Sequence, residues 1–229
     1  MSVRPPSAWV FPPLEELAPG DDLIAVGADL EPETLLDAYE AGYFPMPVGR
    51  RRIGWFSPDP RGILEPNNLH VSRSLRRSLG RFDVTVDQNF GEVIRACADP
   101  SRPHGWIDRR VIDAYTRLHH LGHAHSVEVW DRYGLAGGLY GIAIGGFFAG
   151  ESMFHRHTDA SKVALVHLVN LLGDRPGTLI DVQWSTPHLA SLGVTEIGRH
   201  DYAARLRAAV ELPPSQVLDP NRSSGDNRV

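Results

Sequence analysis

The sequence predicts a mixed fold of helices and strands, α/β or α+β, in two parts of unequal size. About the first sixty residues are rich in Pro and Gly and carry one clear helical pattern, whereas helical and strand patterns alternate from about Gly62 onward. A chain of 229 residues can form one large core or two smaller ones. We expect a small N-terminal domain over residues 1–61, a larger domain over 62–212 and a loose polar tail over 213–229.

Composition and charge narrow the class of protein. With 42% hydrophobic and 22% charged residues the chain is typical of globular proteins, and no stretch approaches the roughly 18 apolar residues that span a membrane. The N-terminal segment lacks the apolar run of a secretory signal, so we expect a cytoplasmic protein. A single cysteine, Cys97, cannot form an internal disulfide, and a formal charge of -5 argues against coating of nucleic acid through bulk positive charge.

The first predicted helix lies in the segment EPETLLDAYEAG. Pro32 suits its first turn and Gly42 its end. Its apolar face consists of Leu35, Leu36 and Tyr39. A Pro-rich segment, WFSPDPR, follows and predicts a rigid loop between the two parts of the chain.

Two helices are expected next, each with a polar residue in the N-cap position. Ser72 caps a short helix on which arginines at a spacing of three and four lie near one face: Arg73, Arg76 and Arg77. Asp108 caps a helix that ends at Gly122. From charge alone these arginines, and the run from Arg50 to Arg52, are interpreted as solvated surface.

An antiparallel meander is predicted from three strand patterns in succession, at 125–130, 135–140 and 147–154. Asp159 is expected to cap the helix that follows, over 161–172. Extended segments at 178–183 and 194–197 flank a short helix opened by Thr186 and Pro187 and ended by Gly193, and Asp201 begins a C-terminal amphipathic helix.

Two polar spots interrupt the apolar strands. Glu151 stands among four large apolar residues, where a carboxylate is costly to desolvate unless it is paired. Its partner could be a cationic substrate or an internal Arg, and an exposed face of an edge strand is a third possibility. Asp181 and Gln183, two apart in a strand, are expected to point the same way, so the carboxylate could polarise the amide. Taken alone, a structural hydrogen-bonded pair is the preferred interpretation of these two.

Histidines cluster at two places, but no metal site is predicted from them. The clusters are His119, His120, His123 and His125, and His155 with His157. No HExxH helix or accompanying carboxylate ligand is found, so scattered surface histidines are expected. The sequence also lacks a GxSxG elbow and a Walker-type loop, which leaves hydrolase and nucleotide-triphosphatase functions unsupported.

Five segments in order resemble the bacterial leucyl/phenylalanyl-tRNA-protein transferase family: residues 42–45 (GYFP), 55–61 (WFSPDPR), 122–130 (GHAHSVEVW), 150–154 (GESMF) and 179–183 (LIDVQ). The resemblance runs from about Gly27 to the C-terminal helix. It implies an α+β fold in which a small N-terminal domain precedes a GCN5-related N-acetyltransferase-like domain, whose mainly antiparallel sheet is flanked by helices. It also implies aminoacyl-tRNA as donor in place of acyl-CoA.

The resemblance implies roles for particular residues. Asp181 and Gln183 would orient or activate the acceptor's α-amino group, and Glu151 would receive the basic side chain of an N-terminal Arg or Lys. The pocket for the transferred side chain and the terminal adenosine would be built from Trp106, Phe148, Gly150, Ser152, Ile180 and Met46. Met46 stands where the family usually has Trp, and Leu168 and Leu172 stand where it often has aromatics. Apart from the resemblance, Arg73, Arg76 and Arg77 on one helix face are spaced to contact successive phosphates of a tRNA acceptor stem, and Arg51 and Arg52 in the basic loop would add to that contact.

The implied reaction moves Leu or Phe, with Met as a third candidate, onto acceptor proteins and marks them for N-end-rule degradation. No metal or other cofactor is expected, and we expect a monomer. Two alternatives stay open. A CoA-dependent N-acyltransferase would share the fold, although the turn at 154–158 has no glycine-rich nest for a pyrophosphate. A catalytically silent tRNA-binding protein would keep the arginines without needing Glu151, Asp181 and Gln183 together.

Overall fold

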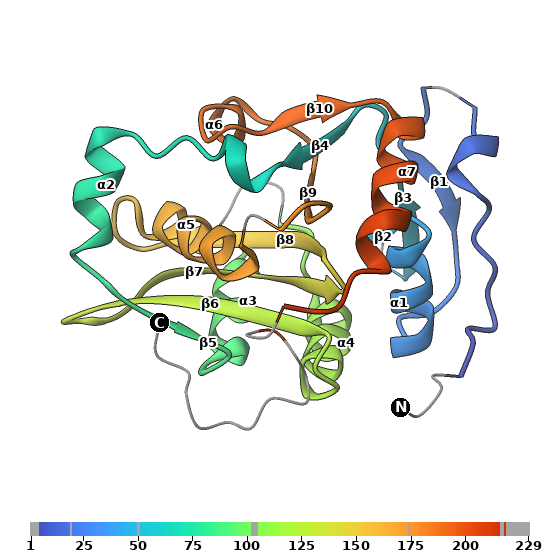
Figure 1. Cartoon of the computed structure of the whole chain (residues 1–229). Helices are drawn as coiled ribbons and strands as arrows, with labels where there is room; N and C mark the ends of the chain where they lie inside the picture. The colour runs from blue at the N-terminus through green and yellow to red at the C-terminus, as the bar shows by residue number, and fades with distance from the viewer. Residues whose placement is uncertain are drawn as a thin grey trace.

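The computed structural model describes residues 5–18, 20–49, 51–101, 105–173, 175–215 and 218. Its strands form two sheets, one of three strands in the N-terminal part and one of seven (Figure 1). Most of the predicted tail over 213–229 and Arg50 lie outside the described residues. No described helix is long and apolar enough to cross a lipid bilayer.

The three-stranded sheet is antiparallel, in the order β1-β3-β2. Its strands are β1 (Leu23–Val26), β2 (Phe44–Val48) and β3 (Arg52–Phe56), and a short 3-10 helix, η1 (Leu14–Glu16), precedes them. The predicted first helix is confirmed as α1 (Pro32–Glu40). It ends before Gly42, whose φ of 87° lies in the left-handed region that glycine adopts without strain.

The larger sheet is mixed, in the order β10-β4-β9-β8-β7-β6-β5. Its strands are β4 (Arg61–Leu64), β5 (Asp83–Val86), β6 (Ala124–Asp131), β7 (Gly134–Ile144), β8 (Phe147–His155), β9 (Leu179–Gln183) and β10 (Thr195–Ile197). β8 and β9 pair in parallel, and the other neighbours pair antiparallel. The predicted meander is confirmed as β6, β7 and β8.

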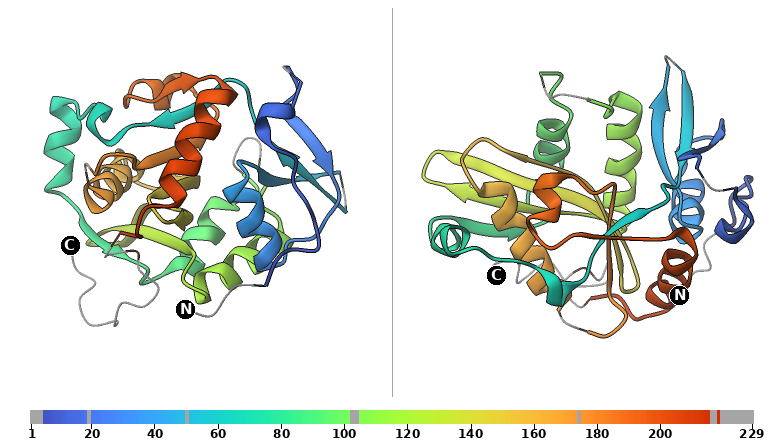
Figure 2. Two further views of the ribbon diagram at one scale, coloured as in Figure 1. Left: turned by 45° about the vertical axis from the view of Figure 1, so that its right-hand side comes forward. Right: turned by 90° about the horizontal axis from the view of Figure 1, so that it is seen from above.

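Helices cover both faces of this sheet (Figure 2). They are η2 (Pro66–Asn68), α2 (Arg73–Leu79), α3 (Phe90–Cys97), α4 (Arg109–His120), α5 (Ala160–Leu172), α6 (Pro187–Ala190) and α7 (Arg199–Val210). α5 packs on one face against β6, β7 and β8, whereas α3 and α4 pack on the other. α3 and β5 were not among the predicted elements.

Of the three predicted helix caps, Ser72 and Asp108 are confirmed and Asp159 is wrong, while Thr186, which was expected to open a helix, also caps it. Ser72, Asp108 and Thr186 each accept a hydrogen bond from the backbone N–H three residues on, at 3.2 Å. Asp159 precedes α5 but makes no capping bond, because its backbone is left-handed with φ of 67°. Its carboxylate instead accepts hydrogen bonds from Ser78 and Lys162. The last helix, α7, begins two residues before the predicted Asp201.

One hydrophobic cluster runs through both parts of the chain. It joins Leu35 of α1 and Trp55 of β3 to Val111 of α4 and Leu206 of α7. A second cluster lies between α5 and its face of the larger sheet. The N-terminal sheet therefore shares buried apolar surface with the larger part.

Candidate active site

A cavity of about 140 Å³ lies between β8, β9, α5 and α6. Its apolar lining consists of Leu139, Met153, Leu165, Leu168, Ile180, Val182 and Leu189. Glu151 and Gln183 contribute its charged and amide groups. A mostly apolar cavity with a few convergent polar groups is the usual form of a small-ligand site.

Glu151 is placed by an irregularity in β8. Tyr140 of β7 pairs with Ser152 but its neighbour Gly141 pairs with Gly150, so Glu151 is an extra residue in the strand. Its side chain is buried, with the residue 8% exposed, and it forms no ion pair with a described residue. The sequence left three possibilities open for Glu151. The exposed strand face is excluded because the residue is buried, and no described Arg forms an ion pair with it.

Neutral donors surround the Glu151 carboxylate. Oε1 accepts a hydrogen bond from Gln183 Nε2 at 3.3 Å, and Oε2 accepts one from the Tyr115 hydroxyl at 3.1 Å. The Tyr115 hydroxyl also shares a hydrogen bond with the Tyr39 hydroxyl. Burial raises the pKa of Glu151 to about 7, although the tyrosine hydroxyls oppose that shift. Binding of a cation beside it would favour the ionised carboxylate.

Asp181 is buried and is not among the residues that line the cavity. Its carboxylate is fully buried and forms a bidentate ion pair with Arg61, at 2.9 Å for Nε to Oδ1 and 2.6 Å for Nη2 to Oδ2. The Tyr202 hydroxyl donates to Oδ2 at 2.8 Å, and the backbone N–H of Gln183 donates to Oδ1 at 2.8 Å. Asp181 therefore contacts the backbone of Gln183, and the side-chain amide of Gln183 points to Glu151.

The expectation that Asp181 and Gln183 share one face of a regular strand is wrong. Between them β9 shifts its register against β4, since Gly62 pairs with Gln183 while Ile63 pairs with Asp181. Gln183 has φ of 62°, a conformation that residues other than glycine rarely adopt. The irregularity at the end of β9 directs Gln183 into the cavity and leaves Asp181 in the interior.

The other residues expected in the substrate pocket fall into two groups. Gly150, Ser152 and Ile180 line the cavity together with Glu151. The remaining three, none of which lines it, are Phe148, Met46 and Trp106. Phe148 is fully buried in the cluster under α5, whereas Met46 on β2 and Trp106 before α4 are partly buried against the larger cluster.

Leu168 and Leu172, both on α5, differ in position. Leu168 lines the 140 Å³ cavity beside Glu151. Leu172 lines a separate cavity of the same size, near Gly122. Only Leu168 of this pair can therefore shape the candidate site.

The arginines expected to contact tRNA do not form one patch. Arg73, Arg76 and Arg77 are exposed on α2, and their side chains make no hydrogen bond or ion pair with any described residue. Arg51 and Arg52 lie where the β2–β3 hairpin turns. α2 and this hairpin stand at opposite ends of the molecule in both figures.

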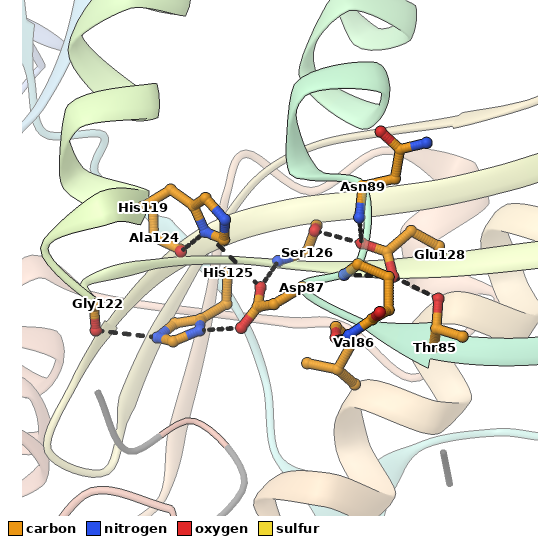
Figure 3. Close-up of polar contacts among 11 residues, drawn as sticks. Thr85, Val86, Asp87, Asn89, His119, Gly122, Ala124, His125, Ser126 and Glu128 are labelled. Atoms are coloured by element: carbon orange, nitrogen blue, oxygen red, sulfur yellow. Dashed lines mark hydrogen bonds and ion pairs between the residues drawn. The ribbon is translucent and has the colours of Figure 1, made fainter. Parts of the chain in front are cut away.

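The histidine cluster is partly internal, which corrects the expectation of surface histidines (Figure 3). His125 is buried; its Nδ1 lies 2.7 Å from Asp87 Oδ2 and its Nε2 lies 3.2 Å from the Gly122 carbonyl oxygen. The nearby Glu128 is also buried, and burial raises its pKa. Within the described part of the chain, no three or more His, Cys, Asp or Glu side chains are arranged so that they could hold a metal ion.

Sequence reasoning missed the polar roles of four residues: Arg61, Tyr39, Tyr115 and Tyr202. Arg61 lay in one of the segments that carried the resemblance, but without an assigned role. The helical pattern placed Tyr39 on an apolar face, and Tyr115 lies in the helix that Asp108 was predicted to cap. The need of a buried tyrosine hydroxyl for a partner was the signal that their side chains serve a polar group.

Comparison with known proteins places the chain in a family. The family model of the Leucyl/phenylalanyl-tRNA protein transferase matches residues 63–207, and that of its N-terminal domain matches residues 28–59. A relative from Anaeromyxobacter sp. (strain Fw109-5), named leucyl/phenylalanyl-tRNA–protein transferase, is 52% identical over 206 residues, which cover 88% of each chain. The relative of the same name from Nitrosospira multiformis is 48% identical, over 88% of this chain and 89% of its own.

A solved structure of L-PGS from Bacillus licheniformis aligns with 70% of this chain and 55% of its own, at 12% identity and a TM-score of 0.38. That likeness is too weak to support an argument about the fold. The family models and the relatives together cover both parts of the chain, including β8 with Glu151 and β9 with Gln183. The chain therefore belongs to the leucyl/phenylalanyl-tRNA–protein transferase family.

Proposed function

We propose that the protein transfers Leu or Phe from aminoacyl-tRNA to the N-terminal Arg or Lys of acceptor proteins, which marks them for N-end-rule degradation. One observation carries the choice of a basic acceptor. Glu151 is a buried carboxylate at an apolar cavity, and among the described residues it has neutral hydrogen-bond donors but no direct ion pair with a cationic side chain. The guanidinium or ammonium group of an acceptor would supply the missing charge.

The aminoacyl ester of the donor is already activated, so the enzyme has to position an amine against it and stabilise the oxyanion. The apolar lining of the cavity would take the transferred side chain, with Leu165, Leu168 and Ile180 as its contacts. The Gln183 amide, 3.3 Å from Glu151, would orient the acceptor's α-amine. This reaction requires no metal or redox cofactor.

Loss of the amine proton needs only modest help, because the unperturbed pKa of an α-amino group is about 7.7 to 8.0. Asp181 would act on this step through Gln183, whose backbone it contacts. Assistance from the terminal ribose hydroxyl of the tRNA is the other route.

The donor's acceptor stem would be held by the exposed arginines of α2, with Arg51 and Arg52 as a second contact. We also propose that the seven-stranded sheet is of the GCN5-related N-acetyltransferase type, with domain boundaries near residues 61 and 212. We also propose that the protein acts as a monomer.

The test compares acceptor peptides that begin with Arg or with Asp, using radiolabelled leucyl-tRNA. Wild-type protein should label the Arg peptide and not the Asp peptide. Glu151→Gln should raise KM for the Arg peptide on the order of tenfold or more, since it removes a charge-assisted contact. Glu92→Gln, a change of the same kind outside the cavity, is the control. Equal labelling of both peptides, or unchanged kinetics in Glu151→Gln, would remove Glu151 from acceptor recognition.

A further inference from the structure

We propose that Arg61 and Tyr202 are positioning residues of the transfer reaction, which hold the Asp181 carboxylate so that it fixes Gln183 beside Glu151. The inference rests on the proposed function for the identity of the reaction. In this inference Asp181 is a buried carboxylate that holds its neighbour in place. Arg61 and Tyr202, which do not line the cavity, hold Asp181 in turn.

The hydrogen-bonding capacity of Asp181 is already filled. An ionised carboxylate offers about four acceptor sites. Four donors occupy them, two on each oxygen: Arg61 Nε and the Gln183 N–H on Oδ1, and Arg61 Nη2 and the Tyr202 hydroxyl on Oδ2. Because the carboxylate is also fully buried, a substrate amine reaches it only by displacing one of these donors.

Asp181 controls the backbone of Gln183. The φ of 62° at Gln183 is strained for a residue with a side chain, and such a conformation persists where its surroundings over-determine it. The N–H of that residue donates to Asp181 at 2.8 Å, while its side-chain amide donates to Glu151 at 3.3 Å. The carboxylate therefore holds the conformation that directs the amide into the cavity.

Arg61 also contacts the chain next to α1, the helix that carries Tyr39 near Oε2 of the Glu151 carboxylate. Its Nη1 donates to the Gly42 carbonyl oxygen at 3.1 Å, at the turn between α1 and β2. α1 carries Tyr39, which is hydrogen-bonded to Tyr115, the donor to Glu151 Oε2. The Arg61 guanidinium packs over the ring of Tyr202 at 4.4 Å, so one buried unit connects α1, β4, β9 and α7.

The discriminating variant is Tyr202→Phe, which removes one donor to Asp181 and keeps the ring under Arg61. Tyr43→Phe is the matched control, since Tyr43 is equally buried and its hydroxyl donates to the Pro12 carbonyl oxygen. We expect Tyr202→Phe to lower kcat on the order of tenfold, with KM for aminoacyl-tRNA changed less than about twofold. Tyr43→Phe should keep the wild-type kcat at a comparable loss of melting temperature.

A second readout does not depend on activity. The side-chain amide resonance of Gln183 in a 1H–15N spectrum, assigned with Gln183→Ala, should move in Tyr202→Phe and stay in place in Tyr43→Phe. A Gln183 resonance that stays in place in Tyr202→Phe overturns the proposal. So does a fall in kcat that follows melting temperature equally in both variants.

Arg61→Lys extends the test, because lysine keeps the charge but cannot form the bidentate pair. It should lower kcat more than Tyr202→Phe does and move the same resonance, whereas wild-type kcat in a folded Arg61→Lys variant contradicts the assignment. Failure of the proposed function has a different signature: wild-type protein would not label Arg acceptors, while the Gln183 resonance would still respond to Tyr202→Phe.

Discussion

At the scale of single residues, Glu151 couples its ionisation to the stability of the fold. Its pKa is about 7 in the folded state against an ordinary value of 4.5, so the folded state binds its proton more tightly. The contribution of this proton to the free energy of unfolding is fully present below pH 4.5 and is lost as pH rises through 7.

Glu151→Gln cannot ionise, so we expect its stability relative to wild type to improve as pH rises from 4.5 to 8. The relative gain should be at most about 3 kcal/mol, because the pKa of Glu151 rises from 4.5 to about 7 on folding. Urea unfolding of both proteins across this range measures it. If the difference in stability between the two proteins is independent of pH, burial does not raise the pKa of Glu151.

The sequence led to Glu151 and Gln183 but not to their geometry. Glu151 stood out because a carboxylate among large apolar residues needs a partner, an argument that holds without coordinates. The extra residue in β8 and the irregular end of β9 depend on pairing with β7 and β4, which a strand's own periodicity does not specify. Arg61, 120 positions from Asp181, is brought to it only by the complete sheet.

At the scale of elements, α2 offers the clearest test of tRNA contact. Its three arginines make no ion pair with a described residue, so replacing all three with Ala should cost little stability. The same change should reduce the slope of log affinity against log salt by up to about three units. With fewer phosphate contacts, tRNA binding releases fewer counterions.

Affinity for differently charged tRNAs should fall about equally, because phosphate contacts do not read sequence. Arg109→Ala, at another exposed arginine, is the control. An unchanged slope in the triple variant would remove α2 from the tRNA site, and a large drop in melting temperature would indicate a structural role.

α5 allows a matched test of the pocket. We expect Leu168→Phe to narrow the cavity and to lower kcat/KM for phenylalanyl-tRNA relative to leucyl-tRNA by about tenfold. Leu172→Phe makes the same change on the same helix at a different cavity and should leave that ratio unaltered. If the two variants change the ratio equally, the 140 Å³ cavity does not select the transferred amino acid.

Helix positions were predicted better than strand partners because helix signals are local. Ser72 and Asp108 cap their helices through contacts three residues away. Asp159 is the informative exception, since Ser78, 81 positions earlier, takes its carboxylate. The local sequence around Asp159 does not predict its contact with Ser78.

At the scale of the whole molecule, the hydrophobic cluster shared by α1, β3, α4 and α7 predicts cooperative unfolding. Urea transitions followed by tryptophan fluorescence, to which buried Trp55 of β3 contributes, and by far-UV circular dichroism should coincide. Two separated transitions would show that the three-stranded sheet unfolds independently. The order of the seven strands, with β4 inserted between β10 and β9, could not be predicted, because sequence-distant strands meet there.

In the proposed reaction the Gln183 amide acts beside the reacting amine at the Glu151 cavity. Single-turnover transfer of labelled leucine from leucyl-tRNA to an Arg-terminated peptide measures this step, with leucyl-tRNA affinity determined in parallel. The proteins compared are wild type, Gln183→Ala and the control Gln88→Ala, which removes an amide that lies outside the cavity and donates to the Val86 carbonyl oxygen. Gln183→Ala should slow transfer on the order of a hundredfold with tRNA affinity nearly intact, and Gln88→Ala should behave as wild type. A Gln183→Ala variant that transfers at the wild-type rate, or loses tRNA affinity in proportion to its rate, would show that the Gln183 amide does not act on the acceptor amine.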